Sequence, residues 1–151
     1  MTDIKLRPDQ SYAAAAAAVI ATRASDVFSH SQTRVLDVER PESVHKMRVA
    51  TRRLRAALEI FGPAFPRTRQ RAALSEVKLL AAALGERRDC DVQIELLESL
   101  RAQARRSERH AIDALIANLR DEQDAANGRL AAALAHAQKA KLERRLRRLS
   151  Q

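Results

Sequence analysis

Apolar residues recur every three to four positions along most of this chain, which is the spacing of one face of an α-helix. The first such segment follows a run of six alanines and contains Val19, Ile20, Val27, Phe28 and Val35. The same spacing continues through the rest of the sequence. It predicts five helices, over about 11–38, 41–61, 66–84, 89–105 and 107–149.

Residues that favour helix ends separate these segments. Pro41 fits the first turn of the second helix, and Gly62 with Pro63 would end it. Gly85 is predicted to cap the third helix, and Asp89 or Asp91 is predicted to begin the fourth. The pair Asn127–Gly128 is predicted to interrupt the last helix. Because the connections are short, consecutive helices should pack antiparallel. We therefore expect one all-α domain over 1–151, an up-and-down antiparallel bundle of four to five helices.

Composition supports an all-helical domain. Alanine and leucine account for 48 of the 151 residues, whereas glycine and proline account for only 7. A β-sandwich or barrel would need more turn residues and more β-branched side chains. The single cysteine, Cys90, excludes an internal disulfide, and no apolar run is long enough to span a membrane. We therefore expect a cytoplasmic protein.

The net charge of +9 comes largely from arginine, which supplies 23 of the 28 basic residues. The planar guanidinium matches phosphate and carboxylate, so this bias favours an oxyanion partner. With 3% aromatic residues and no tryptophan, recognition of single strands by base stacking is disfavoured.

One segment, 44–61, concentrates this charge. At about 100° per residue, four side chains lie within about 80° of one another and extend roughly 15 Å along the axis: His45, Arg48, Arg52 and Arg55. No acid occurs between Glu42 and Glu59. Like charges at helical spacing repel, so the row favours a site for a linear polyanion. The alternative is a solvated face whose arginines pair with acids on neighbouring helices.

Two stretches, HKMRVATRRLR and LLAAALGERRDCDV, resemble the conserved-histidine α-helical domain (CHAD) family over about 44–97. The resemblance implies a helical bundle that binds inorganic polyphosphate in a basic channel, without catalysis and without a metal or other cofactor. Carried over by position, it implies polyphosphate contacts from His45, Arg48, Arg52, Arg55, Lys78 and Arg88. Arg53, Arg87 and Lys46 are second-tier anion contacts; Arg87 is expected in a loop. The resemblance also extends the cytoplasmic expectation to polyphosphate granules.

Family members usually have two tandem halves, each with a basic helix, whereas this sequence has one such helix. We therefore expect a half-length domain, and we hypothesise a homodimer in which two copies line one channel.

Several other signals remain open. The basic C-terminal end, 139–151, is a frayed solvated helix end, an extended anion surface, or a site for nucleic acid or a membrane. Asp89 and Asp91 are expected to cap a helix or to orient Arg87 and Arg88 rather than to bind a metal. Cys90 is expected to be a buried structural thiol. The alternative functions are binding of a DNA or RNA backbone, a phosphohydrolase activity, and a helical adaptor for an acidic protein.

Overall fold

The structure, a computed structural model, describes residues 4, 6–30 and 32–149. This part of the chain forms six α-helices and one short 3₁₀ helix, and it contains no strand. They are α1 (Tyr12–Phe28), α2 (Gln32–Leu36), α3 (Pro41–Ile60), η1 (Gly62–Ala64), α4 (Arg67–Gln103), α5 (Arg106–Lys139) and α6 (Leu142–Leu149). The predicted all-α fold is confirmed, although with more helices than the four to five expected.

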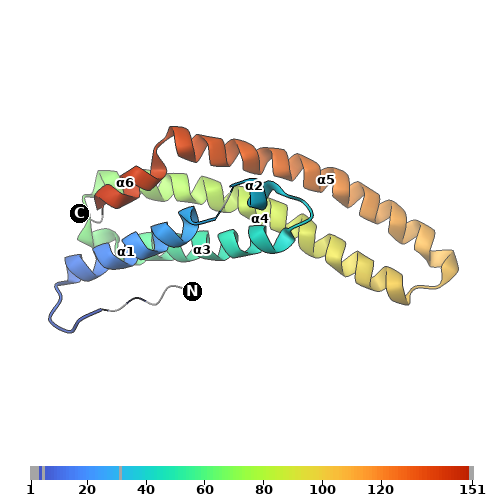
Figure 1. Cartoon of the computed structure of the whole chain (residues 1–151), viewed down its shortest axis with the longest axis horizontal. Coiled ribbons are helices and arrows are strands. Elements are labelled where there is room, and N and C mark those ends of the chain that lie inside the picture. The colour runs from blue at the N-terminus through green and yellow to red at the C-terminus, as the bar shows by residue number, and fades with distance from the viewer. Residues whose placement is uncertain (1–3, 5, 31, 150–151) are drawn as a thin grey trace.

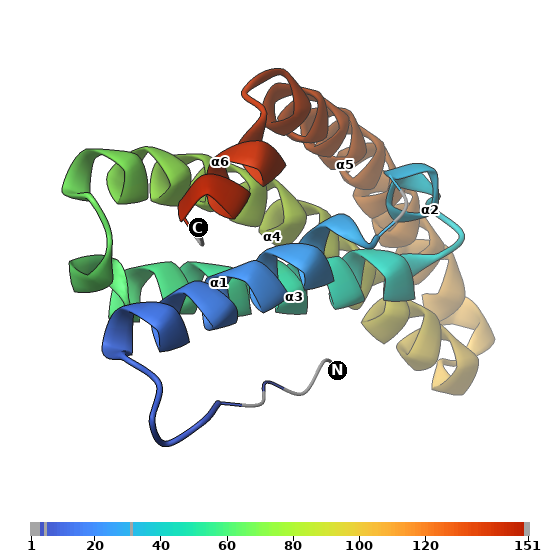
Figure 2. The same ribbon diagram turned by 60° about the vertical axis from the view of Figure 1, so that its left-hand side comes forward.

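Four long helices, α1, α3, α4 and α5, run alternately in opposite directions, as Figure 1 shows. The short helix α6 lies across one end of the bundle and contacts both α1 and α4, which the turned view in Figure 2 makes clear. Because α4 and α5 have 37 and 34 residues, against 20 for α3, they extend beyond α1 and α3 as a two-helix arm (Figure 1).

One hydrophobic core joins all six helices. Its fully buried large side chains include Ile20, Val27, Val35, Leu54, Leu58, Leu80, Leu84, Leu130, Leu142 and Leu146. Burying a leucine or isoleucine completely stabilises a fold by roughly 1.5–3 kcal/mol. The core therefore fixes the faces that each helix turns to solvent.

The first predicted helix, 11–38, is in fact two helices. Ser11 caps α1, since its hydroxyl accepts a hydrogen bond of 3.2 Å from the Ala14 N–H. At the other end the Ser29 hydroxyl donates to the Asp26 carbonyl at 2.8 Å, a local bond that competes with helix continuation. The following helix α2 is held in place by Asn127 of α5, which donates to the Leu36 carbonyl at 2.8 Å.

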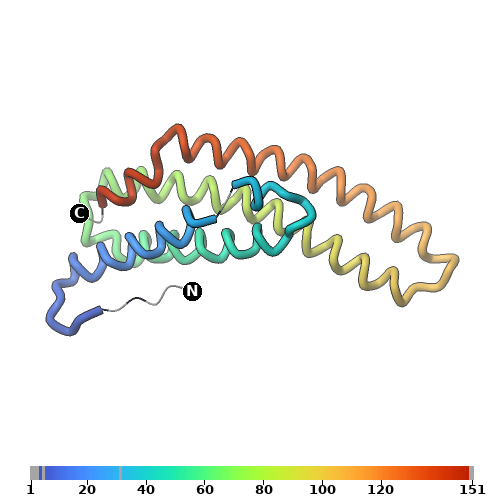
Figure 3. Tube along the Cα trace, viewed as in Figure 1, coloured from blue at the N-terminus to red at the C-terminus, as the bar shows by residue number. Residues whose placement is uncertain are grey.

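Two of the three glycines expected to end or interrupt helices, Gly85 and Gly128, lie inside helices instead. Gly85 does not cap a helix, because α4 continues through it and through 86–88, which are predicted to lie between two helices. Likewise α5 continues through Asn127 and Gly128. Both helices are unbroken in the tube of Figure 3. Tertiary packing of α4 against α5 overrides the weak helix propensity of glycine here.

Replacing either glycine by alanine is expected to stabilise the protein. A Cβ added at Gly85 or Gly128 meets no atom within 4 Å, so alanine fits without strain. Each change should add about 1 kcal/mol to the free energy of unfolding and raise Tm by about 2–4 °C. Thermal unfolding followed by circular dichroism measures this; a lower Tm for Gly85→Ala would contradict an unbroken α4.

The last predicted helix, 107–149, also breaks once, between α5 and α6. Lys141 adopts the left-handed conformation, with φ of 54°, which costs a non-glycine residue about 1–2 kcal/mol. The turn redirects the chain so that Leu142, Leu146 and Leu149 are buried in the core. The C-terminal helix is therefore docked, and the reading of 139–149 as a frayed end is wrong; 150–151 lie outside the described residues.

Candidate anion-binding site

Helix α3 carries the predicted cationic row, and its packing explains why the row faces outward. The buried stripe of α3 consists of Val44, Met47, Ala50, Thr51, Leu54, Ala57 and Leu58. This stripe is held against α1 and α4, which are the main neighbours of α3. The basic side chains lie on the remaining surface, here named the α3 basic face: His45, Lys46, Arg48, Arg52, Arg53 and Arg55.

Arg48 and Arg52 form the centre of this face. They are one helical turn apart; Arg52 is exposed and Arg48 is half-buried. Within the part of the chain that the structure describes, neither makes a salt bridge or a side-chain hydrogen bond. For these two residues, the alternative in which the arginines pair with acids on neighbouring helices is not observed. Two guanidiniums held side by side without a counter-ion leave their donors available to an external anion.

Arg55 and Lys78 meet at a shared carboxylate. The Glu59 Oε1 atom lies 3.1 Å from Arg55 Nε and 3.4 Å from Lys78 Nζ on α4. The hydrogen bond from Arg55, helped by Lys78, lowers the pKa of Glu59 below its ordinary value. The structure thus brings Lys78 next to the α3 basic face, and an acid just beyond the row neutralises one end of it.

His45 lies on the side of α3 that faces the end of α1. With Lys46, Arg53 and residues around His30, it lines a hollow of about 500 Å³. Two acids also line this hollow, and one of them, Glu42, lies 3.8 Å from Lys46. Arg53 and Lys46 therefore share the surroundings of His45, whereas Arg48, Arg52 and Arg55 do not line the hollow.

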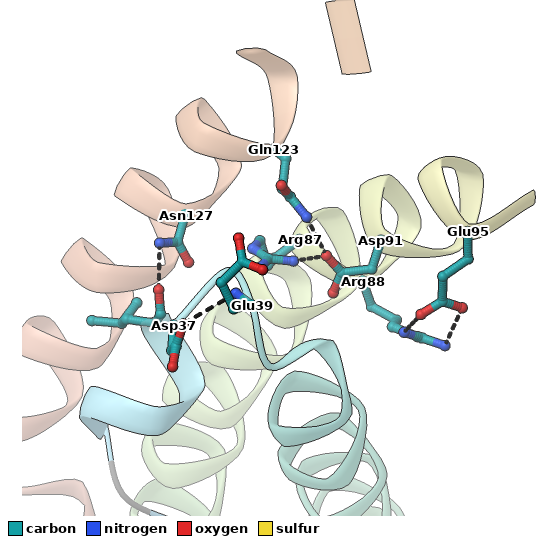
Figure 4. A network of polar contacts seen from close by, with 9 residues as sticks. Asp37, Glu39, Arg87, Arg88, Asp91, Glu95, Gln123 and Asn127 are labelled. Carbon is teal, nitrogen blue, oxygen red and sulfur yellow. Dashed lines mark hydrogen bonds and ion pairs between the residues drawn. The ribbon is translucent and has the colours of Figure 1, made fainter. Parts of the chain in front are cut away.

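The two arginines of the second motif lie inside α4 rather than at a turn. Arg88 pairs with Glu95 at 3.1 Å and its side chain is 18% exposed. Arg87 is completely buried and pairs with Asp91, which also accepts a 2.7 Å hydrogen bond from Gln123 of α5, as drawn in Figure 4. The expectation of Arg87 in a loop is wrong, and its buried side chain is not part of the basic surface.

Cys90 and the neighbouring aspartates have structural surroundings. Asp91 pairs with Arg87, which agrees with the expectation that it orients an arginine. Neither Asp89 nor Asp91 begins a helix, because α4 is continuous there. Cys90 is buried, and burial raises the pKa of its thiol in spite of the nearby Arg87. Among the described residues, no three His, Cys, Asp or Glu side chains form a group that could hold a metal ion.

The fold and the basic face define the class of protein: an all-helical bundle that presents a cationic helix to solvent. The chain belongs to the CHAD domain family, whose model matches residues 18–151, most of its length. Domains of this family in general bind polyphosphate, and the family is generally one of binding domains. No curated protein and no solved structure matches the chain. None of the helices over the described residues is both long enough and apolar enough to cross a membrane.

Sequence reasoning found the row on α3 but missed two features of the site. The first is Glu59, which lies one turn beyond Arg55 and whose contact with Lys78 depends on how α3 packs on α4. The second is the proximity of the first turns of α4 to α6, which no spacing within either helix indicates.

Proposed function

We propose that this protein binds inorganic polyphosphate through the α3 basic face. The observation that carries the proposal is the pair Arg48 and Arg52, adjacent, accessible and without a counter-ion in the described structure. Lys78 extends the α3 basic face onto α4, and His45 with Arg53 extends it toward the end of α1. Family membership supports condensed phosphate as the ligand.

The proposed chemistry is charge-assisted hydrogen bonding along a repeating chain. Each guanidinium donates two parallel N–H groups to phosphate oxygens, and the ammonium of Lys78 acts as a point charge. Because every phosphate of the ligand is alike, affinity depends on how many of them contact the face. Binding releases counter-ions from the polyanion, so it weakens steeply as the salt concentration rises.

The proposed binding is non-catalytic. Hydrolysis of a phosphoanhydride through a metal ion needs carboxylates free to hold that ion. The acids next to the α3 basic face, Asp26, Glu42 and Glu59, each contact a cation. The test is incubation of long-chain polyphosphate with the protein and Mg²⁺ or Mn²⁺ for hours. No phosphate release is expected, and enzyme-dependent release would contradict the proposal.

Nucleic acid is the alternative polyanion, and a competition experiment distinguishes binding of nucleic acid from binding of polyphosphate. Fluorescent duplex DNA is bound to the protein and titrated with polyphosphate, then the roles are reversed with labelled polyphosphate. We expect polyphosphate to displace DNA at a far lower phosphate concentration. Equal potency would favour a general charge patch, and failure of both anions to bind would favour an acidic protein as the partner.

Glu59 is expected to compete with the ligand for Arg55 and Lys78. The Glu59→Gln change frees both cations, so the affinity for polyphosphate should rise about threefold, within the range of a surface ion pair. Titration at low salt measures the change. Glu86→Gln, which removes the same charge beside Arg129 of α5, is the matched control. A weaker affinity in Glu59→Gln would mean that Glu59 positions the two cations rather than competing for them.

We also propose that two copies pair, so that two α3 basic faces serve one ligand. The arm, residues 92–119, supports this proposal. Four large apolar side chains on it are about half exposed: Val92, Leu96, Leu100 and Leu115. The arm contains four acids and four arginines, so two arms do not repel, and packing them together would make a four-helix bundle. Light scattering at tens of micromolar protein tests this; a monomer there would contradict it.

A further inference from the structure

A second group of arginines gathers at the end of the molecule opposite the arm. A hollow of about 750 Å³ lies between the first turns of α4 and α6, larger than the hollow beside His45. It is lined by Thr68, Arg69 and Ala72 of α4 and by Arg145 and Arg148 of α6. Among the described residues, no acid lines it, in contrast to the hollow beside His45.

The three arginines of this hollow lack partners of their own. Over residues 4, 6–30 and 32–149, Arg69, Arg145 and Arg148 make neither a salt bridge nor a side-chain hydrogen bond. The one acid of α6, Glu143, contacts Arg147 instead, at 2.5 Å. Three guanidiniums from two helices therefore face one hollow with their donors unused.

The start of α4 adds to the same positive potential. No side chain caps this helix, and the N–H groups of a first helical turn have no acceptor within the helix. The positive end of the helix dipole therefore lies beside Thr68 and Arg69. Only the combination of this helix start with arginines of a second helix makes the hollow a candidate anion site.

The packing of α6 favours an anion in solution over a membrane surface as the partner of these arginines. An amphipathic helix binds a bilayer by inserting its apolar face. In α6 that face, Leu142, Leu146 and Leu149, is already buried in the core. Its arginines are thus presented from a fixed scaffold, with no apolar side chains of α6 left to enter lipid.

We propose that this hollow is a second phosphate-binding site, which takes a short condensed phosphate or the end of a longer chain. Arg69, Arg145 and Arg148 bind the phosphate oxygens, and the Thr68 hydroxyl together with the first N–H groups of α4 complete the site. The site is independent of the α3 basic face and would give the protein two separate places to bind phosphate chains.

The test is calorimetric titration with inorganic tripolyphosphate at low salt. The variants are Arg145→Gln with Arg148→Gln, Arg48→Gln with Arg52→Gln, and the control Arg34→Gln with Arg129→Gln at exposed positions of α2 and α5. We expect the first pair to weaken one class of sites at least about tenfold, since two charge-assisted contacts are lost. The control on α2 and α5 should match the unchanged protein, and circular dichroism verifies that all variants are folded.

The outcomes distinguish this proposal from the proposed function. If only the α6 pair alters tripolyphosphate binding, the second site stands, and titration with long-chain polyphosphate then tests the α3 basic face separately. If only the α3 pair does, or if the unchanged protein does not bind tripolyphosphate, the second site is overturned. A separate experiment uses vesicles of phosphatidylcholine with phosphatidylglycerol. Binding of α6 to vesicles but not to tripolyphosphate would also overturn the proposal, in favour of a lipid headgroup.

Discussion

Replacing Arg48 and Arg52 together by glutamate is expected to lower the affinity for long-chain polyphosphate at least about a hundredfold. The double change removes two bidentate donors from the centre of the α3 basic face and places two negative charges there. Neither residue has an ion pair or a side-chain hydrogen bond in the described structure, so the double change breaks no internal polar contact. The salt dependence should also become shallower, by about two in the slope of log K against log salt.

The control for this result is Arg34→Glu with Arg129→Glu, which changes the net charge equally at exposed positions of α2 and α5 that belong to neither the α3 basic face nor the arm. It should reduce the affinity only slightly, through the overall field. Circular dichroism and thermal unfolding establish that both variants are folded. Unchanged binding in a folded Arg48→Glu, Arg52→Glu protein would mean that the ligand occupies another surface.

Breaking the buried pair between Arg87 and Asp91 is expected to be the most destabilising change among those considered. Both side chains are inaccessible to solvent, and burial lowers the pKa of Arg87 because it disfavours a cation. Arg87→Met leaves the Asp91 carboxylate buried without its cation, which should cost about 3–5 kcal/mol in the free energy of unfolding. Urea unfolding followed by circular dichroism measures the loss.

The double variant Arg87→Met, Asp91→Leu separates a buried ion pair from a general loss of packing. Arg87 Nε and Nη2 and Asp91 Oδ2 have no hydrogen-bond partner in the described structure, so the pair is incompletely satisfied. Replacing both partners by apolar side chains should restore stability to within about 1 kcal/mol of the unchanged protein. A double variant as unstable as the single one would contradict this account. Folded Arg87→Met should still bind polyphosphate, because Arg87 does not reach the surface.

The sequence predicts helices well where a continuous apolar stripe is bounded by strong end signals. For α3, Pro41 and Gly62 mark the ends, and the structure agrees to within one residue. Elsewhere the end signals mislead, because Gly85 and Gly128 lie in helices whose long-range packing decides their conformation. The breaks after Phe28 and Lys139 contain neither glycine nor proline, and they depend on where Val35 and Leu142 reach the core.

For the site, the sequence shows which residues share one face of a helix, but it does not show which residues of two different helices come into contact. The outward row on α3 follows from the 3.6-residue repeat alone. The contact of Lys78 with Glu59 and the hollow between α4 and α6 require the relative placement of two helices. The burial of Arg87 could not be predicted either, because Arg87 is expected between two helices and therefore not on the same helix as its partner Asp91.

The central claim is that this protein binds polyphosphate in preference to other polyanions. The most direct test is calorimetric titration of the unchanged protein with long-chain polyphosphate at two salt concentrations, with duplex DNA as the comparison. The account predicts tight binding that weakens strongly with salt and is much tighter, per phosphate, than binding to DNA. Absence of binding, or equal binding to both polyanions, would contradict it.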